Sequence, residues 1–396
     1  MARCRSHRYL LQPTVPQRTR LERLLLNQCE LYNAALEERR GAWKWERRSV
    51  SYIDQSRTLT TLRELRPEVL EHGVTVCRGT LKRLDRAFGA FYRRCRTGEA
   101  PGFPRFKAAR CFDSVQWEDI GGWRMDTERS RLRLLGIGDV KVRLHREIRG
   151  TAKAITVARE GRRFWVTVRC VDVPAVSLPS TGRHVGIDLG VCAQVATSDG
   201  QLVVDGRYGR RARARLAAAQ RALATKRRGS NHRERAIERV AAHHRKVRNQ
   251  RKDLAQKLSR ELVNRYDLIV HEDLKIASMV RRPKPRRADD GTYQPNGAAA
   301  KGGLNRSVAD AGWGQLLGFI AYKAEEAGRE VIAVNPRHTS QRCSQCGHVA
   351  AANRPTQAKF SCQACGHQAH ADINAATNIL RAGRARQASA CAGSTN

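Results

Sequence analysis

Three carboxylates stand at widely separated places in the sequence, each at the edge of an apolar segment. Asp188 follows the run 185–187, Glu272 follows the run 268–270, and Asp372 opens a helix-like segment. Magnesium prefers carboxylate oxygen as a ligand, so acids that converge from two strands and a helix would bind divalent ions. In a chain of net charge +38, this pattern predicts a metal site that cuts nucleic acid.

The order of elements around these acids is typical of an RNase H-like nuclease. The strand with Asp188 precedes two further strands at 193–197 and 201–204, a long helical stretch, the strand with Glu272, another helix and strand, and the helix with Asp372. In such enzymes two metal ions about 3.5–4 Å apart activate water and stabilise the departing 3′ oxygen of a phosphodiester. We therefore expect an α/β nuclease domain.

Two alternatives to this interpretation are less favoured. An Asp between glycines after a strand also occurs in sugar kinases and actin-like ATPases, but those proteins need phosphate-binding glycine loops, and no such loop follows Asp188. Isolated surface acids would not explain why the carboxylates follow apolar strands.

The neighbours of the acids have less specific interpretations. Asp273 adjoins Glu272, and its side chain would point to the opposite face of a continuing strand, which gives it a secondary place. His271 and His370 flank two of the acids. A role in orienting a metal ligand and a simple packing role are equally open for both histidines.

Four cysteines form two CxxC pairs that are separated by 15 residues, with a glycine after each pair: Cys343, Cys346, Cys362 and Cys365. This spacing predicts a tetrahedral structural Zn²⁺ site, in which the protein fills all four positions. Two independent disulfides are the less favoured alternative. The other eight cysteines are single, and we expect them to be small buried hydrophobes.

The charge of the chain indicates its partners. Lys and Arg total 75 against 37 Asp and Glu, so a polyanion such as nucleic acid should neutralise the excess. The stretch 205–260 alone carries 19 basic residues against 4 acidic ones and is expected to line a duplex or an RNA. No apolar run approaches the roughly 18 residues of a membrane span, and no secretory signal is present. We expect a soluble, cytoplasmic, nucleoid-associated protein without a membrane partner.

The chain is long enough for several domains, and its patterns predict an α+β multidomain protein. Alternating strands at 1–15 and 105–180 predict a β-barrel that is interrupted by a helical insertion at 16–104, with Thr14 as the N-cap of the first helix. The nuclease domain is expected at 181–340 and 367–383, with the zinc ribbon inserted at 341–366. Two segments are expected to lack fixed structure, the loop 281–303 and the tail 384–396.

These motifs together resemble the TnpB family of transposon-encoded proteins, which are ancestral to compact type V CRISPR effectors. The resemblance rests on the three acidic motifs and on the run 335–347 (Asn-Pro-Arg-His-Thr-Ser-Gln-Arg-Cys-Ser-Gln-Cys-Gly). It also includes 101–107 (Pro-Gly-Phe-Pro-Arg-Phe-Lys), 304–307 (Leu-Asn-Arg-Ser) and 312–314 (Gly-Trp-Gly). It spans nearly the whole chain, with 281–303 as the least similar part.

The resemblance implies an RNA-guided DNA endonuclease of an insertion-sequence element, which cuts beside a short flanking motif with one RuvC-like site. Its implied partners are a transposon-derived guide RNA and target DNA, without a small-molecule substrate, and its cofactors are two Mg²⁺ (or Mn²⁺) ions and a structural Zn²⁺. Asp188, Glu272 and Asp372 would be the catalytic, metal-binding triad. The barrel would be the wedge domain and the helical insertion the recognition domain.

Two other functions stay open from the sequence. One is an RNA-guided DNA-binding repressor without cleavage, against which the three intact acids count. The other is a transposase that performs strand transfer with the same acids, and RNA that copurifies with the protein would argue against it.

Overall fold

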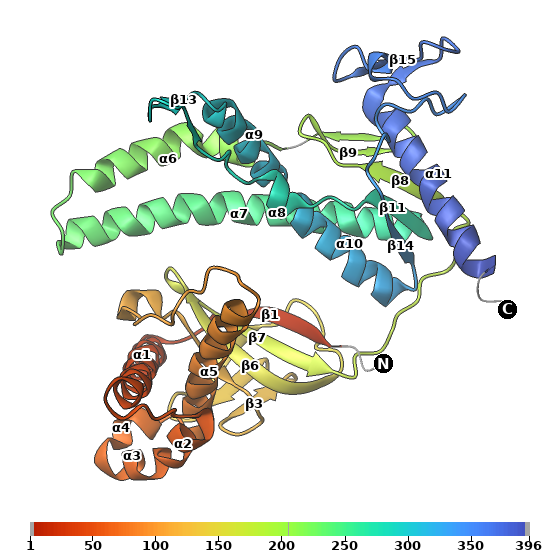
Figure 1. Ribbon diagram of the computed structural model, residues 1–396. Helices are drawn as coiled ribbons and strands as arrows, with labels where there is room; N and C mark the ends of the chain where they lie inside the picture. Colours follow the sequence, from red (N-terminus) through yellow and green to blue (C-terminus); the bar gives the residue numbers. More distant parts are fainter. Residues whose placement is uncertain (1–3, 205, 393–396) are drawn as a thin grey trace. The chain divides into compact units, whose positions relative to one another are not determined.

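A computed structural model describes residues 4–204 and 206–392 of the chain. The chain divides after Pro174 into two compact units, each with its own hydrophobic core (Figure 1). The first unit contains the amino-terminal strand, a helical segment and most of the antiparallel strands. The second contains the three acids and the cysteine pairs.

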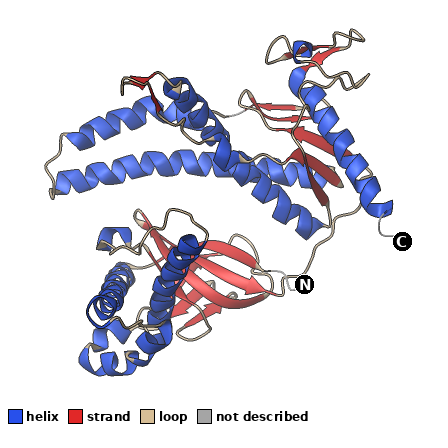
Figure 2. Cartoon of the chain, in the orientation of Figure 1, coloured by secondary structure: helices blue, strands red, loops and turns tan. Residues whose placement is uncertain are grey.

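A seven-stranded antiparallel sheet forms the framework of the first unit (Figure 2). Its strand order is β2-β6-β7-β1-β5-β4-β3, so the amino-terminal strand lies in the middle and pairs with β5 and β7. The predicted joining of the first strand to later ones is therefore confirmed. The strands are β1 (Arg5–Gln12), β2 (Ser114–Trp117), β3 (Trp123–Asp126), β4 (Arg131–Leu134), β5 (Gly138–Arg143), β6 (Thr151–Glu160) and β7 (Arg163–Val171).

The helical insertion packs its apolar residues into the core of this unit. Thr14 caps the first helix as predicted, since its side chain accepts from the backbone N–H of Gln17 while the Gln17 side chain accepts in return. The segment between the two long helices forms three short helices. The helices are α1 (Val15–Glu46), α2 (Tyr52–Arg57), α3 (Leu59–Leu65), α4 (Pro67–Leu70) and α5 (Val74–Arg96), and η1 (Ala109–Cys111) is a single 3₁₀ turn.

The second unit is built on a five-stranded sheet of order β10-β9-β8-β11-β14. Strands β8, β11 and β14 are parallel to one another, and β9 and β10 run antiparallel to β8 and β9 respectively. Side chains of β8 pack with α7 and α10, whereas Leu268 and Val270 of β11 pack with Ile379 of α11. Helices therefore cover both faces of the sheet. The strands are β8 (His184–Asp188), β9 (Ala193–Thr197), β10 (Leu202–Val204), β11 (Leu268–Glu272) and β14 (Glu330–Val334), and the covering helices include α10 (Trp313–Ala327) and α11 (Ala371–Ala392).

The basic stretch between β10 and β11 is a helical hairpin rather than one long helix. Helices α6 (Tyr208–Ala224) and α7 (Asn231–Arg265) pack against each other and are joined by a turn in which Gly229 has a positive φ of 80° (Figure 1). Ser230 caps α7 by accepting from the N–H of Arg233. Asp205, at the start of the predicted stretch, lies outside the described residues.

Two segments predicted to lack fixed structure are ordered in the described chain. The segment 281–303 contains a small hairpin of β12 (Arg286–Arg287) and β13 (Tyr293–Gln294), and it then enters α9 (Ala298–Ala311) shortly after α8 (Ile276–Met279). An Asp290–Gly291 turn closes the hairpin, with Gly291 at a positive φ.

The prediction that the tail is disordered is also wrong for residues 384–392, because α11 continues to Ala392. Arg386 donates to the carbonyl of Ala333 on β14 at 2.6 Å, which anchors this extension to the sheet. Residues 393–396 lie outside the described range. None of the helices formed by the described residues is long and apolar enough to cross a membrane.

Candidate active site and cysteine cluster

Asp188 and Glu272 end two adjacent parallel strands. Ile187 of β8 is in register with His271 of β11, so the next residue on each strand is one of the two acids. Lateral neighbours in a parallel pair point to the same face, which directs both carboxylates to one side of the sheet. That side is the one covered by α11, because Gly186 of β8 touches this helix.

Two glycines allow α11 to approach the sheet closely. A Cβ atom on Gly186 would lie 2.1 Å from the backbone oxygen of Ala376, and one on Gly383 would lie 2.4 Å from a methyl carbon of Val270. Asp372 lies four residues before Ala376, one helical turn nearer to the strand ends that carry the acids. The close approach therefore brings the third acid towards the other two.

The other two acids affect the proton affinity of Asp188. Burial, followed by the charges of Glu272 and Asp372, raises the pKa of Asp188 to about 7, against the opposing effects of Arg354 and the Leu189 N–H. Burial also raises the pKa of Glu272, while a hydrogen bond from Thr339 opposes that change. Asp372 is buried and Asp188 and Glu272 are half-buried, so these neighbouring acids make a site that a divalent cation would stabilise.

The acidic site is open rather than closed. Among the described residues, the three carboxylates do not form a group whose ligand atoms all lie within 4.8 Å of one another, whereas the four cysteines do. Ligands on opposite sides of two ions that are about 3.5–4 Å apart need a wider spacing than ligands of one ion. The donor set and its charge fit Mg²⁺.

Two residues that the sequence did not single out contact the acids. Arg354 donates to Asp372 at 2.8 Å and to the carbonyl of Gln357 at 2.7 Å. Thr339, which is 8% exposed, donates its hydroxyl to Glu272. Thr339 lies in the run 335–347 that carries the family resemblance, but no pattern of spacing marks Arg354 as a site residue.

Asparagines of α11 hold the segment that carries Thr339. The Asn378 side chain donates to the carbonyls of Thr339 at 3.0 Å and Arg342 at 2.7 Å. The Asn374 side chain donates to Arg342 at 2.8 Å and accepts from the N–H of Ser344 at 2.9 Å. The helix that bears Asp372 thus also fixes the Thr339 contact to Glu272.

The residues that flank the acids have local roles. Asp273 is exposed and pairs with Lys275 at 2.7 Å. His271 makes a 2.8 Å contact through Nδ1 with the backbone oxygen of Glu272. His370 accepts from the N–H of Asp372 at 3.3 Å and so caps the start of α11. This contact gives His370 a positioning role that the sequence left open.

The four cysteines form a compact cluster next to α11. The Sγ atoms of Cys343 and Cys365 are 3.7 Å apart, and those of Cys346 and Cys362 are 3.6 Å apart. Four thiolates about 2.3 Å from one zinc would lie about 3.8 Å from each other, whereas a disulfide is about 2.05 Å long. The cysteines are free thiols, and a hydrogen bond from the backbone N–H of Cys365 lowers the pKa of Cys362 to about 6. The cluster fits zinc and contradicts two disulfides.

The cluster belongs to a small ribbon between β14 and α11. The ribbon contains η2 (Ala351–Asn353) and a hairpin of β15 (Lys359–Ser361) and β16 (Gln368–His370). Asn353 is fully buried and donates to the carbonyls of Gln341 and His348 at 2.9 and 3.2 Å, which ties the first knuckle to the turn before Arg354.

The single cysteines are less uniform than predicted. Of the seven whose side chains the structure describes, three are buried (Cys29, Cys77 and Cys170), as expected for small hydrophobes, but four are exposed (Cys4, Cys95, Cys111 and Cys192). The prediction is wrong for the exposed four because a single cysteine has no spacing pattern that indicates its burial.

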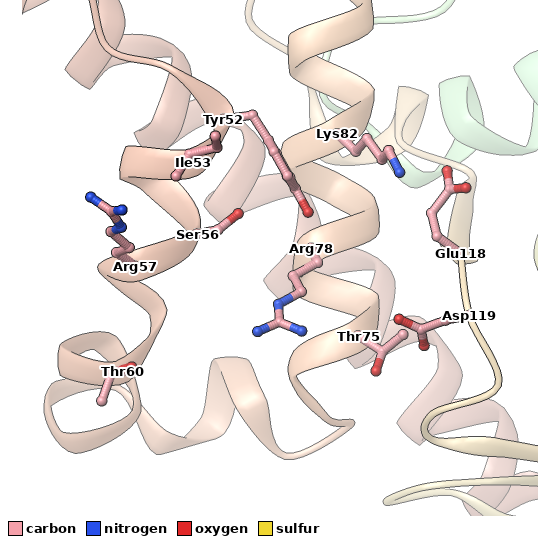
Figure 3. Close-up of a pocket in the computed structure, with 10 residues that line it drawn as sticks. All are labelled: Tyr52, Ile53, Ser56, Arg57, Thr60, Thr75, Arg78, Lys82, Glu118 and Asp119. Atoms are coloured by element: carbon pink, nitrogen blue, oxygen red, sulfur yellow. The ribbon is translucent and has the colours of Figure 1, made fainter.

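The first unit contains a polar cavity of about 540 Å³. Figure 3 shows hydroxyl groups and charges of both signs on its walls, from α2, α3, α5 and the segment after β2. Its lining residues are Tyr52, Ile53, Ser56, Arg57, Thr60, Thr75, Arg78, Lys82, Glu118 and Asp119. Glu118 is paired with Arg86 at 2.6 Å, so part of the acidic charge is already neutralised. The cavity walls carry hydroxyl groups and charges of both signs, whereas the acidic site is built from three carboxylates.

Comparisons with known proteins agree with the motifs. Residues 168–282 match the family described as probable transposase (OrfB_IS605), and residues 313–379 match the Cas12f1-like TNB domain. A protein of Escherichia coli (strain K12) with the provisional name RNA-guided DNA endonuclease InsQ is 33% identical over 77% of this chain and 73% of its own length. A Streptomyces pristinaespiralis protein, provisionally named an RNA-guided DNA endonuclease, is 30% identical over 98% of this chain and 90% of its own.

One solved structure shares the fold. It is the cryo-EM structure of a Cas12f1–sgRNA–target DNA complex, which aligns over 91% of this chain and 82% of its own with a TM-score of 0.54 and 16% identity.

Proposed function

The chain belongs to the TnpB family, and we propose that it is an RNA-guided DNA endonuclease of an insertion-sequence element. The single observation that carries the proposal is the convergence of Asp188, Glu272 and Asp372 at one end of the second unit's sheet. The names of the two similar bacterial proteins support the same activity.

The second unit is assigned as an RNase H-like, RuvC-type nuclease domain. The three parallel and two antiparallel strands, in the order β10-β9-β8-β11-β14, support this assignment together with the positions of the acids. The ribbon between β14 and α11 is an insertion in this domain, and its hairpin extends past the predicted bound of residue 366 to His370. In the first unit, the sheet corresponds to the wedge domain and the helices of 16–104 to the recognition domain.

Asp188, Glu272 and Asp372 would hold Mg²⁺, which when bound supplies an activated water and stabilises charge on the leaving oxygen. The protein prepares this site by burying the carboxylates and directing them to one face. Thr339 orients Glu272, and His370 fixes the helix start that carries Asp372.

Arg354 completes the site in this proposal. Its guanidinium lies against Asp372 and lowers the pKa of Asp188, so it offsets part of the acidic charge when no cation is bound. It also supplies N–H donors of the kind that bind phosphate oxygens.

The cysteine cluster would hold one structural Zn²⁺. All four positions are filled by protein thiolates, so the ion has no open position for chemistry. Its role is to keep the ribbon folded, and with it Arg354 and Thr339 in contact with the acids.

Guide RNA and target DNA are the partners in this proposal. Base pairing would supply sequence specificity while the protein contacts the backbone. The arginine-rich hairpin of α6 and α7 is a strongly basic segment suited to this contact.

The decisive experiment combines RNA sequencing with plasmid cleavage. RNA that copurifies with the full chain is identified, and a plasmid that matches its guide segment is incubated with the complex and Mg²⁺. We expect cleavage that EDTA and Asp188→Ala both abolish, while Asp273→Ala, a change of the adjacent exposed acid, leaves it intact.

The same experiment separates the alternative functions. Target binding without cleavage by the wild-type complex would identify a guided repressor. Purification without a specific RNA, together with strand-transfer products, would identify a transposase.

A further inference from the structure

A second cavity in the first unit lies where α1 ends. It has a volume of about 970 Å³, within the range of sites that accept small ligands. Its walls come from the end of α1, the following segment 48–51, α5 and Phe103 (α1 and α5 are labelled in Figure 1). The polar cavity of Figure 3 has a separate set of lining residues.

The cavity is lined by aromatic side chains that are unusually exposed. Trp45 is 77% exposed, Trp43 57%, Tyr92 53% and Phe103 45%. None of these four belongs to the hydrophobic core of the unit, although α1 contributes many core residues upstream. Scattered exposed hydrophobics need no explanation, but four aromatic rings on one cavity indicate a binding surface.

Ring contacts hold part of this wall in place. Phe103 packs edge-on against Phe88, with centroids 5.5 Å apart at 88°, and against Phe91, with centroids 5.2 Å apart at 76°. Such T-shaped contacts are favourable and fix the orientation of a ring. These contacts fix the ring of Phe103 as part of the cavity wall.

Cationic groups stand beside the rings. The Lys44 ammonium lies 4.2 Å from the Trp45 ring centroid. Arg39 is 8% exposed and lines the cavity, with Nε bonded to Gln55 at 2.9 Å and Nη1 to Asp85 at 3.2 Å. Its buried Nη2 has no hydrogen-bond partner among the described residues, and a buried donor without a partner is costly.

The composition of the wall favours one class of ligand. Among the residues that line the cavity, Val50 is the one valine, leucine, isoleucine or methionine, and its side chain is buried. Grooves that receive an amphipathic helix use aliphatic and methionine side chains instead. Aromatic faces with arginine and lysine are the surfaces on which unpaired RNA bases stack while their phosphates meet the cations.

We propose that this cavity binds unpaired bases of an RNA strand, which stack on Trp43 and Trp45 beside Arg39 and Lys44. The proposal depends on the proposed function only for the source of the RNA, which would be a single-stranded segment of the guide. The site lies in the first unit and takes no part in cleavage.

The test measures stacking directly in the full-length chain with Asp188→Ala, so that no cleavage occurs. The probe is an RNA hairpin with the fluorescent base 2-aminopurine in its loop, titrated at elevated salt to weaken charge-driven binding. We expect the fluorescence to be quenched on binding, and the double change Trp43→Ala with Trp45→Ala to weaken affinity about 5- to 100-fold. Trp→Tyr at both positions should restore part of it.

A matched control separates stacking from folding and charge. Leu65→Ala removes an equally exposed apolar side chain of the same unit, and it should leave binding unchanged. The tryptophan changes remove no charge, so the dependence of affinity on salt should keep its slope, whereas Lys44→Ala should reduce that slope.

Several results would overturn the proposal. The wild type and the tryptophan double variant could bind the RNA with equal affinity, or 2-aminopurine could be quenched equally in the paired stem. The same loop made of DNA could bind more tightly, or a proline-rich peptide could bind in place of RNA. Because the readout is oligonucleotide binding, loss of plasmid cleavage by the wild-type chain would count against the proposed function and leave this inference standing.

Discussion

The second unit contains two sites with ligands for metal ions, and they are built in opposite ways. The four thiols lie within 4.8 Å of one another and come from a short ribbon, whereas the three carboxylates are spread more widely and come from two strands and a helix. The thiol cluster encloses a single position with four protein ligands. At the acidic site, Arg354 and Thr339 donate hydrogen bonds to two of the three carboxylates.

This difference shows how structure separates stability from chemistry. A closed site stabilises the ribbon when an ion binds, because all ligands are satisfied by one cation. An open site keeps buried acids near one another at a cost in stability, which the raised pKa of Asp188 records. The ribbon connects the two, since it supplies both Arg354 and the cysteines.

The largest effect that would test this contrast is on catalysis. Asp188→Asn keeps the shape of the side chain but removes a metal-binding charge, so DNA cleavage should fall by at least about 10³-fold. Zinc content, measured by mass spectrometry of the metal, should stay at one ion per chain. Asp273→Asn is the control and should cleave normally. If Asp188→Asn also lost its zinc, the two sites would not be independent.

The reciprocal change should affect both sites. Cys346→Ser removes one thiolate, so zinc content should fall and the ribbon should loosen, which displaces Arg354 and Thr339 from the acids. Cleavage should drop by about 10²-fold, as for misplaced positioning groups. Cys192→Ser, at an exposed single cysteine, should change neither quantity. Full cleavage by a zinc-free chain would contradict a supporting role for the ribbon.

The approach of α11 to the sheet can be tested without touching either set of ligands. Gly186→Ala places a methyl group 2.1 Å from the Ala376 carbonyl oxygen, so the free energy of unfolding should fall by about 1–3 kcal/mol. Denaturant titration measures this change. Gly318→Ala, inside α10 where a Cβ meets no atom within 4 Å, should be neutral or stabilising. Equal effects of the two changes would contradict a tight helix–sheet contact at Gly186.

The smallest effect concerns pH. In the metal-free chain the pKa of Asp188 is about 7, above its ordinary value of 3.8, so the folded state holds this proton more tightly than the unfolded state. The resulting stability is complete below about pH 4 and is lost as pH rises through 7. Asp188→Asn should therefore raise the melting temperature at pH 8 by a few degrees and leave it nearly unchanged at pH 4.

Added Mg²⁺ should stabilise the wild type at pH 8 more than the Asp188→Asn variant. The contradicting outcome is a difference in melting temperature between the metal-free wild type and Asp188→Asn that is the same at pH 4 and pH 8. It would show that burial and the neighbouring acids do not raise the pKa of Asp188.

Much of the site was predictable because each part has a local signature. The acids follow apolar strands or open a helix, and the strand order is encoded by the alternation of elements along the chain. The ordered segment 281–303 and the extension of α11 to Ala392 were missed, because hairpins of two residues per strand have no periodicity and the extension is held by tertiary contacts such as that of Arg386.

Arg354 and Thr339 mark the limit of sequence reasoning at the site. Each acts through one contact with a residue that lies 18 or 67 positions away, and such a contact leaves no spacing pattern. The aromatic cavity was missed for the same reason, since Trp43 and Phe103 lie on different segments and only the packing of α1 against α5 brings them to one wall.

The sequence by itself determined which residues are the candidate metal ligands, because thiol spacing within one ribbon and acids at the ends of apolar strands are properties of short segments. Only the tertiary structure decided how closely the acids approach, which face they share and which groups hold them. The physical reason is that Asp188, Glu272 and Asp372 are far apart along the chain. Their meeting depends on strand register and on the close contact of α11 at Gly186, which no local pattern specifies.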